Sequence, residues 1–214
     1  DEPALVRLRA ASAATRIAEW FRDRGDDVVL MMDSLTRYCM AQREIGLSAG
    51  EPPTAKGYPP SVFTLLPKLL ERAGTAETGS ITGIYTVLVD GDDHNEPIAD
   101  AVRSIVDGHI VLSRRLAHAG HYPAIDVLAS VSRVVGAVTT PEQQSVARTA
   151  RGLLAAYAEA VDLIEIGAYV AGSNPQVDRA VALRAALNEF LQQAVDDPTP
   201  AVEAYRRLAE IVAG

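Results

Sequence analysis

One short apolar run that ends in an acid organises the hydrophobic pattern of this chain. Val28 to Met32 are five consecutive apolar residues, and Asp33 follows them directly. A short unbroken apolar run predicts a β-strand that is buried on both faces, as in the interior of a parallel sheet. Ligands of such sheets bind beyond the carboxyl ends of the strands. Asp33 is therefore expected at a ligand-binding edge, although strand-end acids also serve as turn formers and helix caps.

The segment before this strand has helical periodicity. Pro3 suits a first helical turn and Gly25 suits the position after a helix end, so residues 3–23 are predicted to be helical. A helix, a short turn and a buried strand form half of a right-handed α/β crossover, so the chain is expected to begin inside a domain. The predicted apolar stripe of the helix is Leu5, Leu8, Ala13, Ile17, Trp20 and Phe21.

The segment after Asp33 predicts a second helix that ends near residue 48, with Ser34 as its N-cap. Arg37 lies about one helical turn beyond Asp33, where its guanidinium could contact a phosphate or Asp33 itself. The alternative for Arg37 is an ordinary ion pair on the outer face of the helix. Residues 50–60 contain four prolines, which exclude a helix and a central strand and predict a stiff loop.

Helices and strands continue to alternate after this loop. The acidic turn at residues 90–93 lacks the loop length and the distal glutamate of an EF-hand, so it is interpreted as a loop. The further predicted elements are a helix over 61–73, a turn over 74–79, a β-branched strand over 80–89, a helix over 98–106 and a strand over 109–112.

A longer apolar segment from His121 to Arg133 predicts the last strand of this part. Tyr122 is held extended by Pro123, and its ring offers a flat face on which an adenine could stack. The alternative is a tyrosine of the core. Arg133 ends the strand with no acid near it in sequence. An arginine so placed is a candidate finger for the γ-phosphate bound by a neighbouring subunit, and the alternative is a solvated arginine.

The pattern changes at residue 140, where only helical spacing follows. Residues 140–143 have the form of a capping box with proline at the first helical position. The Asn-Pro pair at 174–175 and the Thr-Pro pair at 199–200 mark the starts of two further helices. We therefore predict a sheet domain over residues 1–139 and a small helical bundle over residues 140–214.

Composition limits the classes of function. The net charge is −8 without a basic block, which argues against sequence-independent nucleic-acid binding. Cys39 is the only cysteine, so an internal disulfide is impossible and a reducing compartment is expected. No signal peptide or membrane-spanning run is visible, so a cytoplasmic protein is expected, and peripheral docking on a membrane complex stays open. The four histidines have no zinc spacing.

Five motifs occur in one order along the chain. They are residues 29–38, 50–53, 57–63, 107–114 and 120–126. Together they resemble the ATPases of bacterial type III export, which serve flagellar assembly and injectisomes and are similar to the catalytic subunit of rotary ATP synthases. The resemblance covers nearly the whole chain. It implies an α/β fold, in which part of a RecA-like P-loop ATPase domain with a mostly parallel sheet precedes the helical bundle.

The resemblance assigns roles to five residues. Asp33 matches the Walker B acid that positions the magnesium of Mg-ATP, and Arg37 matches the arginine one turn later, near the phosphates. Tyr85 matches an aromatic residue near the nucleotide, and Tyr122 matches the position that stacks on adenine. Arg133 matches the arginine finger given across the subunit interface. ATP and Mg²⁺ are the implied ligands.

One large feature of the family is missing from the sequence. No Gly-x-x-x-x-Gly-Lys-Ser/Thr motif occurs, so the phosphate-binding loop with its lysine and magnesium ligand is absent. The family's water-polarising glutamate and its N-terminal β-barrel are absent as well. The chain is therefore expected to be the C-terminal half to two-thirds of such an ATPase and to be inactive alone.

The implied function is ATP hydrolysis in a homohexameric ring that powers protein export. The ring would release chaperone-bound substrates and turn a central stalk protein. A stator protein and peripheral contact with a membrane export gate at the inner membrane are further implied, and no nucleic acid is expected. Two alternatives stay open: a subunit related to rotary ATP synthases, against which the missing acidic lever of that subunit argues, and a non-catalytic docking module.

Overall fold

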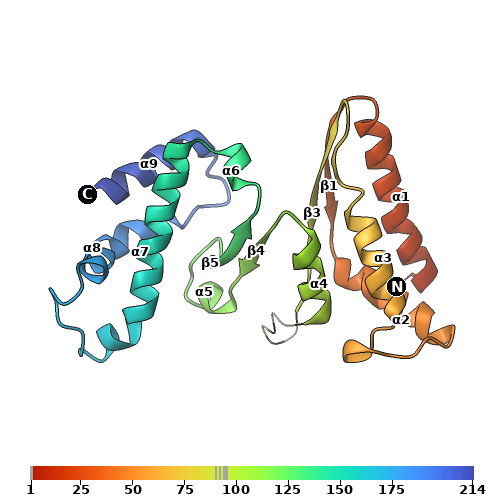
Figure 1. Cartoon of the computed structure of the whole chain (residues 1–214), viewed down its shortest axis with the longest axis horizontal. Helices are drawn as coiled ribbons and strands as arrows, with labels where there is room; N and C mark the ends of the chain where they lie inside the picture. Colours follow the sequence, from red (N-terminus) through yellow and green to blue (C-terminus); the bar gives the residue numbers. More distant parts are fainter. Residues whose placement is uncertain (1, 90, 92, 94–95) are drawn as a thin grey trace. The chain divides into compact units, whose positions relative to one another are not determined.

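The computed structural model describes residues 2–89, 91, 93 and 96–214. The chain divides into two compact units, residues 1–106 and 107–214 (Figure 1). The first unit contains a small sheet with helices, and the second contains a strand pair and the C-terminal helices, so the predicted α/β class is confirmed. No helix in the described part of the chain combines the length and the apolar character that crossing a membrane requires.

The predicted helices of the first unit are confirmed, with boundaries shifted by a few residues. The strand predicted over 80–89 ends earlier, at Tyr85, and a short strand within the predicted turn was not foreseen. The elements are α1 (Ala4–Arg22), β1 (Asp27–Met32), α2 (Leu35–Ser48), the 3₁₀ helix η1 (Ala55–Gly57), α3 (Pro60–Leu70), β2 (Gly74–Thr75), β3 (Ser80–Tyr85) and α4 (Pro97–Ile105).

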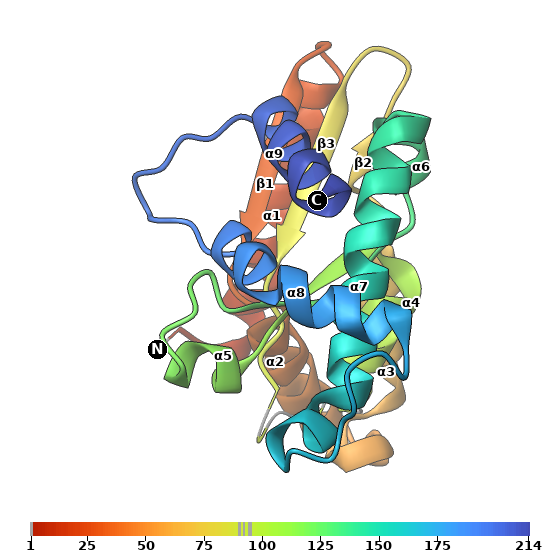
Figure 2. The same ribbon diagram turned by 90° about the vertical axis from the view of Figure 1, so that its left-hand side faces the viewer.

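The sheet of the first unit has the strand order β1-β3-β2. β1 and β3 are parallel, and their register runs from Asp27 opposite Ser80 to Met32 opposite Tyr85. β2 joins β3 antiparallel. Figure 2 shows β1 and β3 side by side and running in the same direction. Their carboxyl ends therefore meet at one edge, where Asp33 follows β1.

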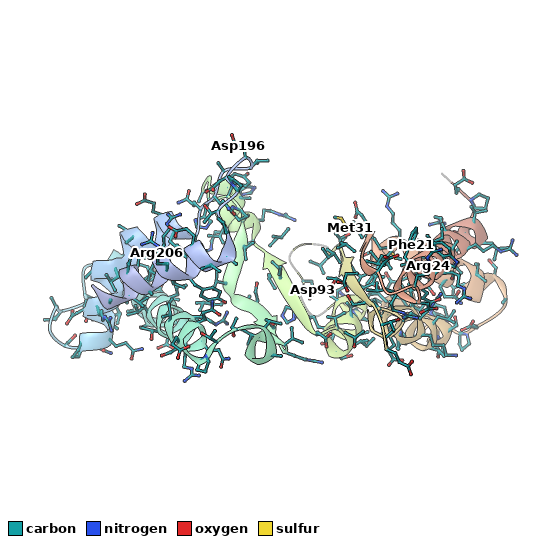
Figure 3. All side chains as sticks on the ribbon, turned by 90° about the horizontal axis from the view of Figure 1, so that it is seen from above. Phe21, Arg24, Met31, Asp93, Asp196 and Arg206 are labelled. Atoms are coloured by element: carbon teal, nitrogen blue, oxygen red, sulfur yellow. The ribbon has the colours of Figure 1, made fainter. Side chains whose placement is uncertain are left out.

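The prediction that β1 is buried on both faces is wrong for this structure. Successive residues of a strand point to opposite faces. Leu30 is 8% exposed and packs with Ala18 of α1, whereas Val29 is 63% and Met31 74% exposed (Figure 3). An apolar run shows that the strand itself carries no polar side chains, but it does not show how many of its faces other elements cover.

The predicted apolar stripe of α1 is wrong in large part. Leu8 packs against the core, but Ile17 and Trp20 are more than half exposed. The buried face instead carries small residues, among them Ala11 and Thr15, and the Thr15 hydroxyl donates to the Ala11 carbonyl at 2.9 Å. Small side chains let α1 approach its neighbours closely, so the large side chains of the helix lie on its other side. The remaining exposed members of the stripe are Leu5, Ala13 and Phe21.

The core of the first unit lies between α2, α3 and α4. Leu35, Leu66 and Ile98 are fully buried there, one from each helix. Cys39 lies in the same core, and burial raises the pKa of its thiol to about 12. The thiol is therefore protonated and shielded at neutral pH. In the acidic turn, Asp90 and Asp92 lie outside the described residues, and the Asp93 carboxylate pairs with the Lys56 ammonium.

A largely buried ion pair joins α1 to the segment after α3. Arg72 donates from Nε to Glu19 Oε1 at 2.6 Å and from Nη2 to Glu19 Oε2 at 2.9 Å. The Glu19 side chain is only 11% exposed. These hydrogen bonds from Arg72, with further help from Arg16, lower the pKa of Glu19 to about 2 from its ordinary value of 4.5.

We expect Glu19→Gln to lower the free energy of unfolding of the chain by about 1–3 kcal/mol at pH 7, because Arg72 loses a charged acceptor. Glu19 has a depressed folded-state pKa, so its contribution is complete above pH 4.5 and is lost as the pH falls toward about 2. The difference between variant and wild type should therefore shrink over this range. Urea unfolding at a series of pH values measures it.

Glu44→Gln is the matched control, since Glu44 pairs with Arg7 at 2.8 Å but is 61% exposed. An exposed pair of this kind contributes less than about 1 kcal/mol. Equal losses for the two variants at pH 7, or a difference that does not change with pH, would contradict the assignment to Glu19.

The second unit pairs two strands and follows them with helices. β4 and β5 are antiparallel and form a sheet of their own, so the only parallel pair among the described residues is β1 with β3. The division at Val106 also differs from the predicted boundary at residue 139, because Val127 of β5 packs against the helical core. The elements are β4 (Gly108–Leu112), α5 (Arg114–His118), β5 (Ile125–Ser132), α6 (Val135–Val138), α7 (Pro141–Glu165), α8 (Pro175–Phe190) and α9 (Ala201–Ala213).

The start signals of the C-terminal helices are confirmed. Thr140 accepts from the Gln143 backbone while the Gln143 side chain accepts from the Thr140 backbone, which is a complete capping box. The Asn174 side chain accepts from two backbone amides of α8. The core between these helices includes Leu153, Leu187 and other apolar residues of α7, α8 and α9.

Candidate functional site

Asp33 lies at the carboxyl edge of the parallel strand pair, as predicted, with an exposed side chain. Its Oδ1 accepts a hydrogen bond from Thr86 Oγ1 at 2.6 Å, and Thr86 is the residue after β3. The same two chain segments are joined by the Thr86 amide, which donates to the Met32 carbonyl at 3.1 Å. The carboxylate is thus held at the edge of the sheet by both strands and faces solvent.

The alternative of Asp33 as a helix cap does not apply, because its neighbour fills that position. Ser34 is the N-cap of α2, and its side chain accepts from the Arg37 backbone amide. The Arg37 side chain is exposed, and within the described ranges it forms no ion pair, either with Asp33 or on the outer face of the helix. The phosphate contact implied for Arg37 stays a prediction.

Tyr85 lies on the core side of β3. Its ring crosses Gly83 so closely that a Cβ at residue 83 would lie 2.5 Å from the tyrosine Cε2. The hydroxyl is buried without a hydrogen-bond partner in the described part of the structure, and burial raises the pKa of Tyr85. Gly83 therefore makes the space that this ring occupies. The role near the nucleotide that the resemblance implies for Tyr85 stays a prediction.

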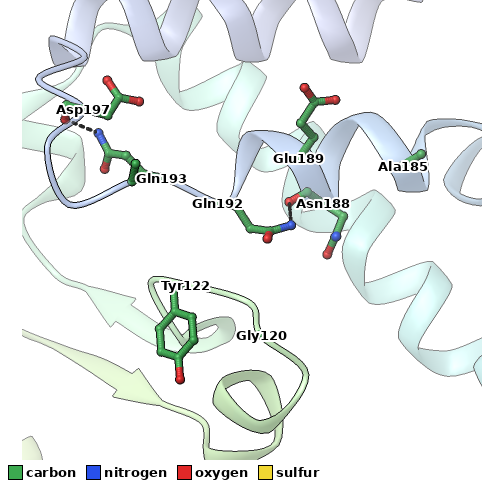
Figure 4. Close-up of a pocket in the computed structure, with 9 residues that line it drawn as sticks. Gly120, Tyr122, Ala185, Asn188, Glu189, Gln192, Gln193 and Asp197 are labelled. Carbon is green, nitrogen blue, oxygen red and sulfur yellow. Dashed lines mark hydrogen bonds between the residues drawn. The ribbon is translucent and has the colours of Figure 1, made fainter.

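Tyr122 lies in the second unit, in the loop between α5 and β5, and it is not a core tyrosine because its side chain is largely exposed. The Gln193 amide donates to the Tyr122 carbonyl at 3.0 Å and fixes this loop against the segment after α8. The ring lies beside an open cavity of about 600 Å³ (Figure 4). Its lining consists of Gly120, Tyr122, Ala185, Asn188, Glu189, Gln192, Gln193, Ala194 and Asp197.

The far wall of this cavity is polar and comes from the end of α8 and the segment that follows it. Figure 4 shows Asn188 on the helix and Gln192 just beyond its end, above the loop that carries Tyr122. Gln192 Nε2 donates to the Asn188 carbonyl at 3.2 Å, and Gln193 Nε2 donates to the Asp197 carbonyl at 3.1 Å. An aromatic face opposite carboxamides, which both donate and accept, suits a flat heterocycle with ring nitrogens and an amino group. Sequence reasoning missed these residues, since the polar end of a helix and the segment after it carry no distinguishing pattern.

Arg133 follows the last residue of β5 and is exposed. Its backbone amide donates to the Asp107 carbonyl at 2.7 Å, which ties the end of β5 to the start of β4. Asp33, Arg37 and Tyr85 belong to the first unit, whereas Tyr122 and Arg133 belong to the second. The described residues contain no cluster of three or more His, Cys, Asp or Glu side chains that could hold a metal ion.

Family models match both parts of the chain. The model "ATP synthase alpha/beta family, nucleotide-binding domain" matches residues 1–132, which is more than half of the sequence. The chain belongs to the ATP synthase alpha/beta family. The model of the T3SS EscN ATPase C-terminal domain matches residues 139–210. Asp33 and Tyr122 lie within the nucleotide-binding match, Arg133 directly follows it, and the α8 wall of the cavity lies within the second match.

Curated members of the ATP synthase alpha/beta family are similar to the chain over nearly its whole length. The flagellum-specific ATP synthase of Pseudomonas aeruginosa is 56% identical over 100% of the chain and 48% of its own length. That of Bacillus subtilis is 56% identical over 99% of the chain and 48% of its own length. The type 3 secretion system ATPase of Pseudomonas syringae is 53% identical over 99% and 47%. The chain thus spans about half the length of these relatives.

Solved structures of family members have the same fold. The assembled ATPase EscN from the type III secretion system of enteropathogenic E. coli matches with a TM-score of 0.96 and 50% identity, over 99% of the chain and 52% of that protein. EscN in complex with its central stalk EscO matches with a TM-score of 0.89 and 50% identity, over 98% of the chain and 50% of that protein. The partial RecA-like α/β fold with a C-terminal helical part is therefore confirmed.

Proposed function

We propose that the protein is the ATPase subunit that powers type III protein export, in flagellar assembly or in an injectisome. The observation that carries the proposal is the combination in one chain of the nucleotide-binding match with the T3SS EscN ATPase C-terminal match. A rotary ATP synthase subunit shares the first part, but the second match favours export. The high identity to both flagellar and secretion ATPases leaves the choice between these two systems open.

The surroundings of Asp33 fit the magnesium of Mg-ATP. Mg²⁺ sites of phosphate-transfer enzymes use one or two carboxylates together with water and substrate phosphates. Asp33 presents one exposed carboxylate, and Thr86 holds its Oδ1. Bound Mg²⁺ would neutralise charge on the β- and γ-oxygens of ATP. Asp33 would fix the ion at the edge of the sheet, and Arg37, one turn along α2, would face the phosphates.

The cavity beside Tyr122 fits the adenine base. The tyrosine ring would stack on the base, and the carboxamides at the end of α8 would contact its polar edge. The nearby loop is tied to the segment after α8 by the hydrogen bond from the Gln193 amide to the Tyr122 carbonyl, so the two walls of the cavity are held together. The polar wall would then belong to the helical domain, which gives that domain a part in nucleotide binding.

We expect Tyr122→Ala to weaken ATP binding by the full-length protein about tenfold, since stacking of a base on an aromatic ring contributes about 1–3 kcal/mol. Tyr122→Phe keeps the ring and serves as the matched control, with an affinity close to that of wild type. Titration calorimetry with ATP measures both. A loss of equal size in the phenylalanine variant would assign the effect to the hydroxyl rather than to stacking, and an unchanged alanine variant would remove Tyr122 from the site.

Arg133 would complete the site of the neighbouring subunit. Water attacks the γ-phosphate in line, and a guanidinium from the next protomer stabilises the charge of the transition state. Such a residue requires a ring, and the assembled EscN structure supports a homohexamer with a central stalk partner. A stator protein, chaperone–substrate complexes and a peripheral contact with the export gate at the inner membrane would be further partners of this cytoplasmic ATPase.

Deletion of the gene and complementation test the proposed function. The deletion strain should fail to export type III substrates while its other secretion routes continue. The full-length wild-type gene should restore export, and Mg²⁺-dependent phosphate release should be measurable with the purified full-length protein. Normal export of every type III substrate in the deletion strain would exclude this function.

A further inference from the structure

β5 contains a bulge just before Arg133. The register pairs Leu112 with Ile125 and Val111 with Asp126, and then resumes at His109 with Val131. Residues 127–130 of β5 therefore stand against Ile110 alone on β4. An excess of this size on one strand bends the strand and re-aims the side chains beyond it.

Side-chain hydrogen bonds stabilise this bulge. The Ser130 hydroxyl donates to the Asp126 carbonyl at 2.6 Å and accepts from the Val111 amide at 2.9 Å. The Asp126 carboxylate accepts from the Ala129 amide at 3.0 Å. These bonds replace strand pairing that the extra residues interrupt, so the bulge has a defined conformation.

One arginine of α7 holds the carbonyls of the bulge. Arg151 donates from Nη1 to the Val127 carbonyl at 2.5 Å and to the Ser130 carbonyl at 3.3 Å, and from Nη2 to the Leu128 carbonyl at 3.3 Å. Three carbonyl dipoles thus converge on a single guanidinium. Without this cation the three carbonyls would lose these hydrogen bonds, and the bulge would lose a contact that orders it.

The bulge sets the register of the strand end that carries Arg133. After it, Val131 and Ser132 pair again with β4, and the Arg133 amide donates to the Asp107 carbonyl. The two strands approach each other closely here: a Cβ on Gly108 would lie only 2.7 Å from the Val131 carbonyl oxygen. A slip of one residue would turn the Arg133 side chain to the opposite face of the strand pair.

We propose that Arg151 is a positioning residue for Arg133: it clamps the β5 bulge to α7 and so fixes the register at which the finger leaves the strand. The inference rests on the proposed role of Arg133 as the finger. It assigns Arg151 no contact with the nucleotide. It also makes α7 the element that connects the helical domain to the strand of the finger.

A double-mutant cycle in the full-length protein tests this inference. We expect Arg151→Ala to lower kcat about tenfold to a hundredfold with little change in KM, since a displacement of about 1 Å at a catalytic group has effects of this size. Adding Arg151→Ala to Arg133→Ala should change kcat by less than about twofold, because a residue that acts through Arg133 has no further effect once the finger is gone. Arg151→Lys should restore part of the rate, since lysine keeps the charge but lacks the planar fork.

Arg148→Ala is the matched control, because Arg148 is exposed on the same helix and forms no hydrogen bond or ion pair in the described part of the chain. Its kcat should equal that of wild type. Thermal unfolding and hexamer assembly are measured for every variant. If Arg151→Ala does not fold, Ser130→Ala removes two other hydrogen bonds of the bulge and replaces it in the same cycle.

The outcomes separate this inference from the proposed function. Additive losses in the double mutant, or a wild-type kcat for Arg151→Ala, overturn the positioning role while the finger assignment stands. A wild-type kcat for Arg133→Ala overturns the finger assignment itself, and the positioning role with it. A nonadditive cycle with a wild-type Arg148→Ala supports the inference.

Discussion

Arg133→Ala in the full-length protein should lower kcat about 10³-fold or more and leave ATP affinity nearly unchanged, as expected for a finger that acts in the transition state. The loss corresponds to about 4 kcal/mol or more of barrier. Arg133 directly follows β5, in a unit of the chain other than that of Asp33, and its backbone is fixed to Asp107. Phosphate release under saturating Mg-ATP measures kcat, and calorimetry measures affinity.

Mixed rings test whether the finger acts across the interface. Arg133→Ala subunits keep an intact magnesium acid, and Asp33→Asn subunits keep an intact finger. Rings assembled from both variants should therefore regain activity that neither variant shows alone. Arg115→Ala, at another exposed arginine of the second unit, is the control and should leave kcat unchanged. A kcat for Arg133→Ala within about twofold of wild type would contradict the assignment of Arg133 as the finger, because an arginine finger raises the rate about 10³-fold or more.

Asp33→Asn should lower kcat at least about 100-fold and raise the Mg²⁺ concentration needed for half-maximal rate, because it removes the carboxylate charge beside the ion. The change is nearly isosteric, and the amide oxygen can still accept from the Thr86 hydroxyl. The loss would therefore report on charge rather than on the fold of the sheet edge. Phosphate release over a magnesium titration gives both quantities.

The same strand supplies a matched control. Asp27 begins β1, and its Oδ1 accepts from Ser80 Oγ at 2.7 Å, just as Asp33 beyond the other end accepts from Thr86 Oγ1 at 2.6 Å. Asp27→Asn makes the same chemical change at the amino edge, where no ligand is expected. Its kcat and magnesium dependence should match those of wild type. Equal effects on kcat at Asp27 and Asp33 would mean that both acids affect the rate by stabilising the sheet. The assignment of Asp33 to a magnesium site would then be wrong.

Both tests depend on structural features that the sequence reveals to different degrees. The strand end at Asp33 and the capping box at Thr140 follow from neighbours in the chain, since apolar runs and N-cap side chains act over a few residues. The wall of carboxamides opposite Tyr122 does not follow from such patterns. Asn188 and Gln192 are distant from Tyr122 in sequence, and they become part of a binding site only because the end of α8 lies beside the loop that carries Tyr122.

By itself, the sequence determined the type and order of most helices and strands, the place of Asp33 after a strand, and the family to which its motifs belong. Only the tertiary structure decided which face of α1 is buried, that β1 is covered on one side, and that Arg151 holds the bulge before Arg133. The physical reason is the distance along the sequence over which each interaction acts. Caps and periodicity act through adjacent residues, whereas burial and hydrogen bonds between α7 and β5 depend on which segments meet in space.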